Sequence, residues 1–143
     1  MKIKKLNQEA KMPTLGTEGA AAYDLYACID APIEIESGNS AMISTGLAMQ
    51  IPLGTVGLLF PRSGLACKRG LRLSNCVGVI DSDYRGPVCA SVYSDSQESQ
   101  VIYPKDRIAQ IMFVKYDLHD WEEVDELDDT NRGIGGFGST GTK

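Results

Sequence analysis

The stretches SAMISTGLAMQIP (residues 40–52) and TVGLLFP (residues 55–61) decide the fold class. Both are apolar runs bounded by glycine or proline, which is typical of short strands that end in turns. Upstream, APIEIE (residues 31–36) alternates apolar and acidic side chains, the pattern of a half-buried strand. Downstream, two more strand-like runs follow, GPVCASVYSD (residues 86–95) and QVIYPKDRIAQIMFVKY (residues 100–116). Strands that recur at this spacing predict an all-β sandwich or barrel.

Only one helix is expected, at SGLACKRG (residues 63–70), because no amphipathic pattern of about ten residues or more occurs. Ser63 is placed to cap its first turn, and Lys68 and Arg69 suit its last turn. Gly70 suits the left-handed backbone that ends a helix. The chain has no internal repeat and no linker, and only its first and last dozen residues are expected to be loosely held.

The composition is that of an ordinary globular domain. With 143 residues, 43% of them apolar and 23% charged, the chain is long enough for one domain with its own core. Its formal net charge of −5 argues against non-specific binding to nucleic acid. The sequence contains no run of about 18 apolar residues, so no membrane span is predicted. The basic N-terminus lacks the apolar stretch of a secretory signal. We therefore expect an intracellular protein, cytoplasmic or nuclear, without membrane or nucleic-acid partners.

The cysteine and histidine content argues against two common kinds of site. Cys28, Cys67, Cys76 and Cys89 are widely spaced and form no CxxC pair, so we expect free, buried thiols in a reducing compartment. His119 is the only histidine, so neither a structural Cys/His zinc site nor Ser-His-Asp chemistry is supported.

Two polar segments have both a functional and an ordinary interpretation. In PRSGLACK (residues 61–68), a helix N-terminus beside Arg62 would bind a small anion such as phosphate, although a capped turn with a surface arginine is the simpler interpretation. NCVGVIDSDYRG (residues 75–86) predicts a β-hairpin with its turn near Asp81 to Tyr84. Its backbone would hydrogen-bond a base edge, Tyr84 would pack on a sugar, and Asp81 would be a general base. A plain Asp-rich turn is the simpler alternative there.

Two further segments place polar side chains on predicted strands. AAYDLYA (residues 21–27) puts Asp24 on a strand, where an inward-facing carboxylate needs an arginine, a metal-bound water or a backbone donor. A structural Asp–Arg pair and a functional site are about equally supported at that position. DRIAQIMF (residues 106–113) places Arg107 and Gln110 within an otherwise apolar strand.

The last segment, RGIGGFGSTGTK (residues 132–143), is rich in glycine and cannot hold one shape by itself. It is not a phosphate-binding P-loop, because threonine stands where that motif needs lysine. Its backbone N–H groups and the hydroxyls of Ser139 and Thr140 would wrap phosphates, Arg132 would add charge, and Phe137 would stack on a base. A disordered tail is the ordinary interpretation.

Taken in order, AAYDLYA, PRSGLACK, GVIDSDYRG, DRIAQIMF and RGIGGFGSTG resemble the five motifs of the trimeric dUTP diphosphatases (dUTPases). Each motif alone is weak, but five in this order, from about Asp24 to Gly141, are specific. The resemblance implies a distorted jelly-roll β-barrel with one short helix, and a homotrimer with shared active sites. It also implies one domain, in which residues 132–143 form a flexible glycine-rich lid on a jelly roll of residues 1–131.

The implied activity is that of a nucleoside triphosphate pyrophosphohydrolase, which hydrolyses dUTP to dUMP and diphosphate with Mg²⁺. That reaction limits uracil incorporation into DNA and supplies dUMP for thymidylate synthesis. By the resemblance, Asp81 activates the water that attacks the α-phosphorus, Gln110 helps to hold water and phosphate, and Asp24 acts through metal-bound water. Tyr84 packs on the deoxyribose and excludes a 2′-hydroxyl, and Arg132 binds the γ-phosphate. The other implied substrate-binding residues are Arg62, Ser63 and Gly64 of a neighbouring subunit, the uracil-contacting Asn75, Gly78, Val79, Ile80 and Cys89, and Phe137, Gly138, Ser139 and Thr140 in the lid.

The chain departs from the family pattern at Ala22, where glycine is frequent, and Cys89 carries a thiol where the family contacts uracil mainly through backbone. The acidic stretch DWEEVDELDD (residues 120–129) is expected to be a solvated or interface strand rather than a metal site. A dCTP deaminase on the same fold would need a glutamate near the hairpin, and none occurs between residues 37 and 97. A non-catalytic nucleotide-binding or regulatory protein is the remaining alternative, and a plain structural jelly roll would leave the five motifs unexplained.

Overall fold

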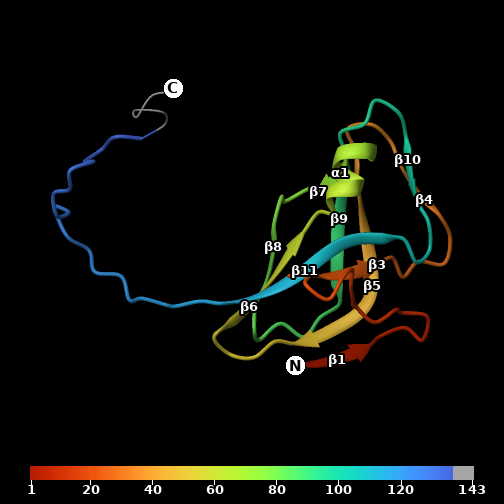
Figure 1. Ribbon diagram of the computed structural model, residues 1–143, viewed down its shortest axis with the longest axis horizontal. Coiled ribbons are helices and arrows are strands. Elements are labelled where there is room, and N and C mark those ends of the chain that lie inside the picture. Colours follow the sequence, from red (N-terminus) through yellow and green to blue (C-terminus); the bar gives the residue numbers. More distant parts are fainter. Residues whose placement is uncertain (137–143) are drawn as a thin grey trace.

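The computed structural model describes residues 1–136 and consists of antiparallel strands with one short helix (Figure 1). One large sheet has the strand order β1 (Lys2–Lys5), β5 (Ser40–Gln50), β9 (Val88–Ser94) and β7 (Leu71–Leu73). The other has the order β2 (Thr14–Leu15), β3 (Tyr23–Tyr26), β11 (Arg107–Lys115), β6 (Thr55–Phe60) and β8 (Gly78–Ile80). A small sheet pairs β4 (Ile33–Ile35) with β10 (Gln100–Ile102), and the helix is α1 (Ser63–Arg69). The predicted all-β class with one short helix is confirmed.

The core is one apolar cluster that receives side chains from both large sheets. Along β9, Val88, Ala90 and Val92 are buried while the residues between them are half-exposed, as the two-residue period of a strand requires. Ile43 on β5 and Ile111 on β11 are fully buried in the same cluster. Burying a side chain of this size stabilises the fold by about 1.5–3 kcal/mol, so the two sheets are held face to face mainly by this contact.

Ile111→Ala is expected to lower the free energy of unfolding by about 2–5 kcal/mol, because it leaves a cavity between tightly packed strands. Val114→Ala on the same strand is the matched control, because Val114 is 36% exposed and its loss should cost about 0.5 kcal/mol. Urea unfolding at one fixed protein concentration measures both. Similar losses for the two variants would contradict this description of the core.

The helix α1 begins at Ser63, one residue earlier than a cap at Ser63 would have placed its start. Arg62 is the N-cap, with extended backbone (φ −90°, ψ 133°), and no side chain caps the first turn. The prediction that Ser63 is the capping residue is therefore wrong: Ser63 is already helical and does not occupy the position from which a hydroxyl reaches the first free N–H groups. Lys68 and Arg69 lie in the last turn and Gly70 is left-handed (φ 63°), as predicted.

The segment around β8 does not form the predicted hairpin. Strand β8 pairs with β6, whereas β9 lies between β5 and β7 in the opposite sheet. Residues 81–87 therefore cross from one sheet to the other. The turn itself is at the predicted place, because the Tyr84 N–H donates to the Asp81 carbonyl at 3.2 Å. Turn residues mark where a chain reverses, but they do not determine which strand it pairs with.

Two other expectations are corrected by the structure. The N-terminal dozen residues are not loose as a whole, because β1 pairs with β5 from Lys2, opposite Gln50, to Lys5, opposite Leu47. All four cysteines are free, but they are not buried: Cys67 and Cys76 are exposed and the other two are half-buried.

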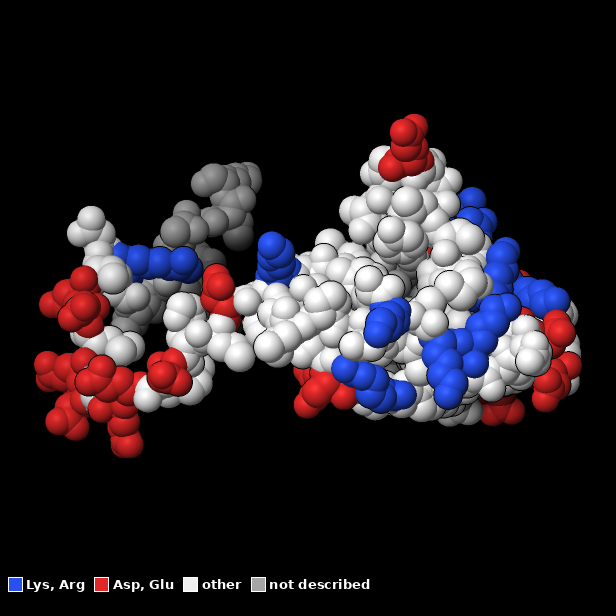
Figure 2. All heavy atoms as spheres, turned by 90° about the horizontal axis from the view of Figure 1, so that it is seen from below, with Lys and Arg blue, Asp and Glu red and all other residues white. Residues whose placement is uncertain are grey.

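Residues 116–136, the C-terminal arm, form neither helix nor strand and lead away from the barrel (Figure 1). The strand expected at residues 120–129 is therefore absent from the described chain, although its side chains are exposed, as expected for a solvated segment. Acidic side chains gather on the arm, while Lys and Arg side chains gather on the barrel (Figure 2). Trp121 and Ile134 on the arm are fully exposed. The predicted lid residues Phe137, Gly138, Ser139 and Thr140 lie outside the described residues.

Within residues 1–136, no helix has the length and apolar character needed to cross a membrane.

Candidate active site

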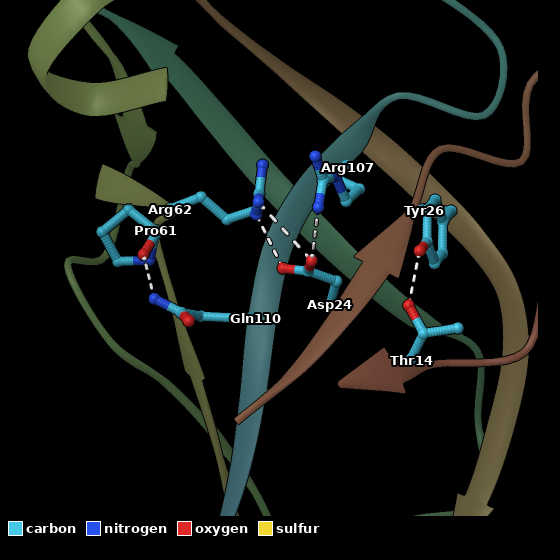
Figure 3. Close-up of polar contacts among 7 residues, drawn as sticks. All are labelled: Thr14, Asp24, Tyr26, Pro61, Arg62, Arg107 and Gln110. Atoms are coloured by element: carbon cyan, nitrogen blue, oxygen red, sulfur yellow. Dashed lines mark hydrogen bonds and ion pairs between the residues drawn. The ribbon is translucent and has the colours of Figure 1, made fainter. Parts of the chain in front are cut away.

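The most buried charge of the barrel is a carboxylate held by two arginines (Figure 3). Asp24 lies on β3 with its side chain 9% exposed. The Arg62 Nε donates to Asp24 Oδ1 at 2.7 Å, and the Arg107 Nη1 donates to Asp24 Oδ2 at 3.1 Å. Charge-assisted bonds of this kind compensate a carboxylate for the loss of water. Of the partners considered for Asp24 from the sequence, the structure supplies arginine, and it supplies two.

Gln110 connects this carboxylate to the segment before α1. It lies on β11 directly opposite Asp24 on one side and Phe60 on the other. Its Nε2 donates to the Pro61 carbonyl at 3.0 Å, which ties β11 to the chain just before Arg62 (Figure 3). The structure therefore brings five predicted site residues into one region, Asp24, Gln110 and Arg62 with Ser63 and Gly64, which follow Arg62 and are exposed. Together they present N–H donors and a guanidinium, which suits an anionic group.

A pocket of about 320 Å³ lies between the β8 region and β9. Its wall contains the seven residues predicted around the nucleoside and the attacking water, Asn75, Gly78, Val79, Ile80, Asp81, Tyr84 and Cys89. Its size is at the lower end of the range for small-molecule sites. The Tyr84 hydroxyl donates to the Pro87 carbonyl at 3.1 Å, so the ring is anchored beside this pocket although Tyr84 is 45% exposed.

Two backbone features shape the pocket. Strand β8 brings its backbone to the wall through Gly78, which is buried against Leu59 of β6. A Cβ added at Gly78 would lie 3.1 Å from the Leu59 Cβ, so a larger residue would push β8 away from β6. Cys76, next to Asn75, has a left-handed backbone (φ 61°), which is uncommon for a residue other than glycine and bends the chain at the pocket.

The carboxylate cluster, which is Asp24 with Arg62 and Arg107, and the pocket are separate within one chain. Asp24 on β3 and Gly78 on β8 are three strand positions apart in the sheet, roughly 14 Å at about 4.8 Å per strand. Among the described residues, no hydrogen bond or ion pair joins Asp81 to Asp24, Arg62 or Gln110. The structure thus gathers most of the predicted residues into two groups, one around Asp24 and one at the pocket.

Arg132 belongs to neither group. It lies on the C-terminal arm, and its Nε donates to the Gly135 carbonyl at 2.7 Å in a local turn. Arg132 is not among the residues that line the pocket, and the arm that carries it leads away from the barrel (Figure 1).

Sequence reasoning missed Arg107 and five residues of the pocket wall, Met42, Leu59, Pro87, Val88 and Ser91. Arg107 was noticed as a charge within an apolar strand, but no role was assigned to it, although it is a direct partner of Asp24. Met42 and Pro87 line the pocket, and no local signal marked them because they come from β5 and from the crossing segment. Within residues 1–136, no group of three or more His, Cys, Asp or Glu residues is arranged to hold a metal ion.

A family profile for dUTPases matches residues 8–141. A deoxyuridine 5′-triphosphate nucleotidohydrolase of Desulfitobacterium hafniense is 48% identical over 132 residues, which span 92% of this chain and 87% of that protein. One of Corynebacterium glutamicum is 45% identical over 142 residues, which span 99% of this chain and 94% of that protein.

Solved structures show the same fold. A dUTPase of Staphylococcus bacteriophage 80alpha with dUpNHpp superposes with a TM-score of 0.85 at 27% identity, over 98% of this chain and 97% of that one. A mutant dUTPase of phage phi11 of S. aureus, described with a structural Mg(II) ion, has a TM-score of 0.77 over 87% of this chain and 96% of that one. At 24% identity, this second likeness shows the fold alone. The expected jelly-roll fold is confirmed by these likenesses.

Proposed function

Because this chain belongs to the dUTPase family, its activity is the hydrolysis of dUTP, and we propose that Asp81 activates the attacking water. The observation that carries this assignment is the pocket of about 320 Å³, which brings Asp81 beside the residues expected to hold the nucleoside. Hydrolysis to dUMP and diphosphate limits uracil incorporation into DNA and supplies dUMP for thymidylate synthesis. A non-catalytic nucleotide-binding role on the same scaffold is not favoured, because Asp81 and the pocket are both present.

The pocket supports a nucleoside that is recognised by its base edge and its sugar. Backbone groups of Gly78 to Ile80, with Asn75, would pair with the uracil edge, and cytosine would leave donors and acceptors unpaired. Unpaired buried polar groups give discrimination of about 10⁴ or more. The Tyr84 ring, anchored by its bond to Pro87, would pack on the deoxyribose and would leave no room for a 2′-hydroxyl.

The reaction assigned to Asp81 is an in-line displacement at the α-phosphorus. A water proton passes to the Asp81 carboxylate as the water oxygen bonds to the α-phosphorus. The bond from that phosphorus to the bridging oxygen breaks, and diphosphate leaves with the electron pair. A carboxylate acting in this way contributes about 10²–10⁴-fold to the rate. Gln110 would help to hold the water and a phosphate oxygen by its amide.

The residues present fit Mg²⁺ bound chiefly to the substrate. Mg²⁺ usually binds through one or two carboxylates together with phosphates and waters, so no cage of three protein ligands is required. Asp24 Oδ2 accepts from both arginines, but Oδ1 accepts only from the Arg62 Nε and keeps a lone pair for a metal-bound water. When bound, Mg²⁺ would neutralise part of the charge on the triphosphate. Arg62 and Arg132 would offset more of it, since dUTP carries about four negative charges and the protein is itself net negative.

The two separate groups support an active site shared between copies of the chain. Arg62, Ser63 and Gly64 of one copy would hold the phosphates of a nucleotide whose base occupies the pocket of another. A homotrimer with three such sites accounts for both groups at once. The exposed Trp121 and Ile134 of the C-terminal arm also support contact with a second copy, because fully exposed large apolar side chains gain from burial.

The glycine-rich end of the chain would act as a lid of the same domain, with the jelly roll as residues 1–131 and the lid as residues 132–143. Arg132 would bind the γ-phosphate and Phe137 would stack over uracil, while Gly138, Ser139 and Thr140 would contact phosphates. Closure over the bound substrate expels water and completes the positive charge around the triphosphate.

Parallel assays of diphosphate release with dUTP, dCTP, dTTP and UTP, with Mg²⁺ present, test the proposed specificity. We expect kcat/KM for dUTP to exceed that for dCTP by about 10⁴ or more, because of the unpaired base edge. Release from UTP at a rate similar to dUTP would contradict the role given to Tyr84. If diphosphate were released from none of the four nucleotides, the non-catalytic nucleotide-binding role would be the remaining interpretation.

A further inference from the structure

Arg107 is the charged residue at the carboxylate cluster whose purpose the proposed reaction leaves open. It begins β11, and its side chain is 49% exposed. The Arg62 guanidinium already reaches both oxygens of Asp24, with Nε at 2.7 Å from Oδ1 and Nη2 at 3.5 Å from Oδ2 (Figure 3). Arg107 adds a second guanidinium at 3.1 Å from Oδ2. One carboxylate thus has two cations, although one arginine can satisfy a carboxylate through both oxygens.

A β-bulge places Arg107 on the correct face of the sheet. The pairing of β11 with β3 shifts between Arg107, opposite Tyr26, and Ala109, opposite Leu25. In an unbroken strand, Arg107 would share its face with Ala109, which is fully buried in the core. The shift puts Arg107 on the face that carries Tyr26 and Asp24 instead. Bulges commonly redirect a side chain beside a functional site, so this local irregularity has a structural purpose.

The second cation becomes necessary when Arg62 changes partner. Arg62 is assigned to substrate phosphates, but here its Nε is held by Asp24. If Arg62 were the only partner of Asp24, its departure would leave a carboxylate that is 9% exposed without any cation. Burying an unpaired charge is costly, and that cost would be subtracted from the affinity for substrate. With Arg107 in place, Asp24 keeps a charged donor throughout.

We propose that Arg107 is a positioning residue: it retains Asp24 as an ion pair and so releases Arg62 to the phosphates of the substrate. This inference rests on the proposed role of Arg62 in dUTP hydrolysis. Arg107 acts through Asp24 and does not contact the nucleotide. Its loss therefore weakens substrate binding more than it slows the chemical step, and the effect disappears when Asp24 no longer carries a charge.

A double-mutant cycle tests the proposal with Arg107→Met, Asp24→Asn and the double variant. Each is measured for kcat, for KM with dUTP, and for the Kd of the analogue dUpNHpp by calorimetry. We expect Arg107→Met alone to raise KM and Kd roughly tenfold, an effect within the range of measured coupling energies between contacting residues. We expect kcat to change less than about threefold. In the Asp24→Asn background, the same change should alter Kd less than about twofold. Arg107→Lys keeps a cation and should recover most of the affinity.

Arg72→Met is the matched control. Arg72 forms an ion pair with Asp95 on the barrel surface, where the hydrogen bond that the guanidinium donates to Asp95 raises the pKa of Arg72. Its loss should leave KM, kcat and Kd unchanged. Thermal unfolding of all variants shows whether Arg107→Met folds. If Arg107→Met does not fold, Arg107→Lys replaces it in the measurements of kcat, KM and Kd.

Two results would overturn the inference. An equal loss of affinity on removing Arg107 with or without the Asp24 charge would mean that Arg107 contacts the phosphates itself. Unchanged KM and Kd in Arg107→Met, with only a lower melting temperature, would mean that the pair merely stabilises the fold. Failure of the proposed function is distinguishable, because the unmodified protein would then release no diphosphate from dUTP, whatever the cycle shows.

Discussion

Asp81→Asn is expected to lower kcat for dUTP by about 10²–10⁴-fold and to leave the Kd for dUpNHpp within about threefold. Asparagine has nearly the same shape as aspartate but cannot accept the proton of the attacking water. The residue lies at the wall of the pocket directly after β8, so the exchange should not disturb strand pairing. Quenched-flow turnover and calorimetric binding on the same preparation separate the two effects.

Asp83→Asn is the control for Asp81→Asn. Asp83 is exposed on the same crossing segment, two residues away, and does not line the pocket. Its exchange removes the same charge from the same loop and should change kcat less than about threefold, as is usual for a surface site. If Asp81→Asn turned over at the normal rate, or if both variants lost activity equally, the assignment of Asp81 as the base would be wrong.

Removing residues 132–143 is expected to lower kcat/KM for dUTP by about 100-fold or more while the barrel stays folded. The deletion removes Arg132 and the glycine-rich segment, so the triphosphate loses a cation and remains open to water. A lid that excludes water and adds positive charge around the triphosphate stabilises the transition state mainly after the substrate has bound. The strands and the apolar core all lie before residue 116, so the deletion leaves their contacts intact.

Circular dichroism and sedimentation of the truncated protein serve as the control for this deletion. An unchanged spectrum and an unchanged oligomeric mass, together with lost activity, support a lid. Arg132→Gln in the full chain should reproduce part of the loss, because it removes the charge but keeps the segment. Should the truncated protein dissociate or unfold, residues 132–143 would be structural and the lid interpretation would fail.

Features set by neighbouring residues were predictable from the sequence. The end of α1 at Gly70 follows from the freedom of glycine to adopt a left-handed backbone, and the turn at Asp81 follows from the turn preference of aspartate. The sequence also indicated that a carboxylate at Asp24 would need a partner. Each of these depends on the residue itself or on a few neighbours.

Features set by distant residues were not predictable in this way. The two partners of Asp24 are 38 and 83 positions away in the sequence, and a β-bulge in β11 is needed to present one of them. The pairing of β8 with β6 instead of β9 likewise depends on how whole sheets pack, because turn residues are compatible with either partner. Strand β1 was taken for a loose end because its alternation of lysines carries no strong apolar signal.

The separation of the pocket from the residues around Asp24 could be recognised only in three dimensions. In the sequence, the motifs simply follow one another, and nothing in their order indicates which belong to one site. The sheet order places Asp24 and Gly78 three strand positions apart, and this distance is the physical reason to expect that more than one copy builds each site.

Hydrolysis of dUTP in water enriched in oxygen-18 tests the central claim most directly. If water activated by Asp81 attacks the α-phosphorus, mass spectrometry will find the heavy oxygen in dUMP and none above background in diphosphate. Heavy oxygen in the diphosphate instead would mean that water attacks the β-phosphorus, and the placement of Asp81 as base for the α-phosphorus would then be contradicted.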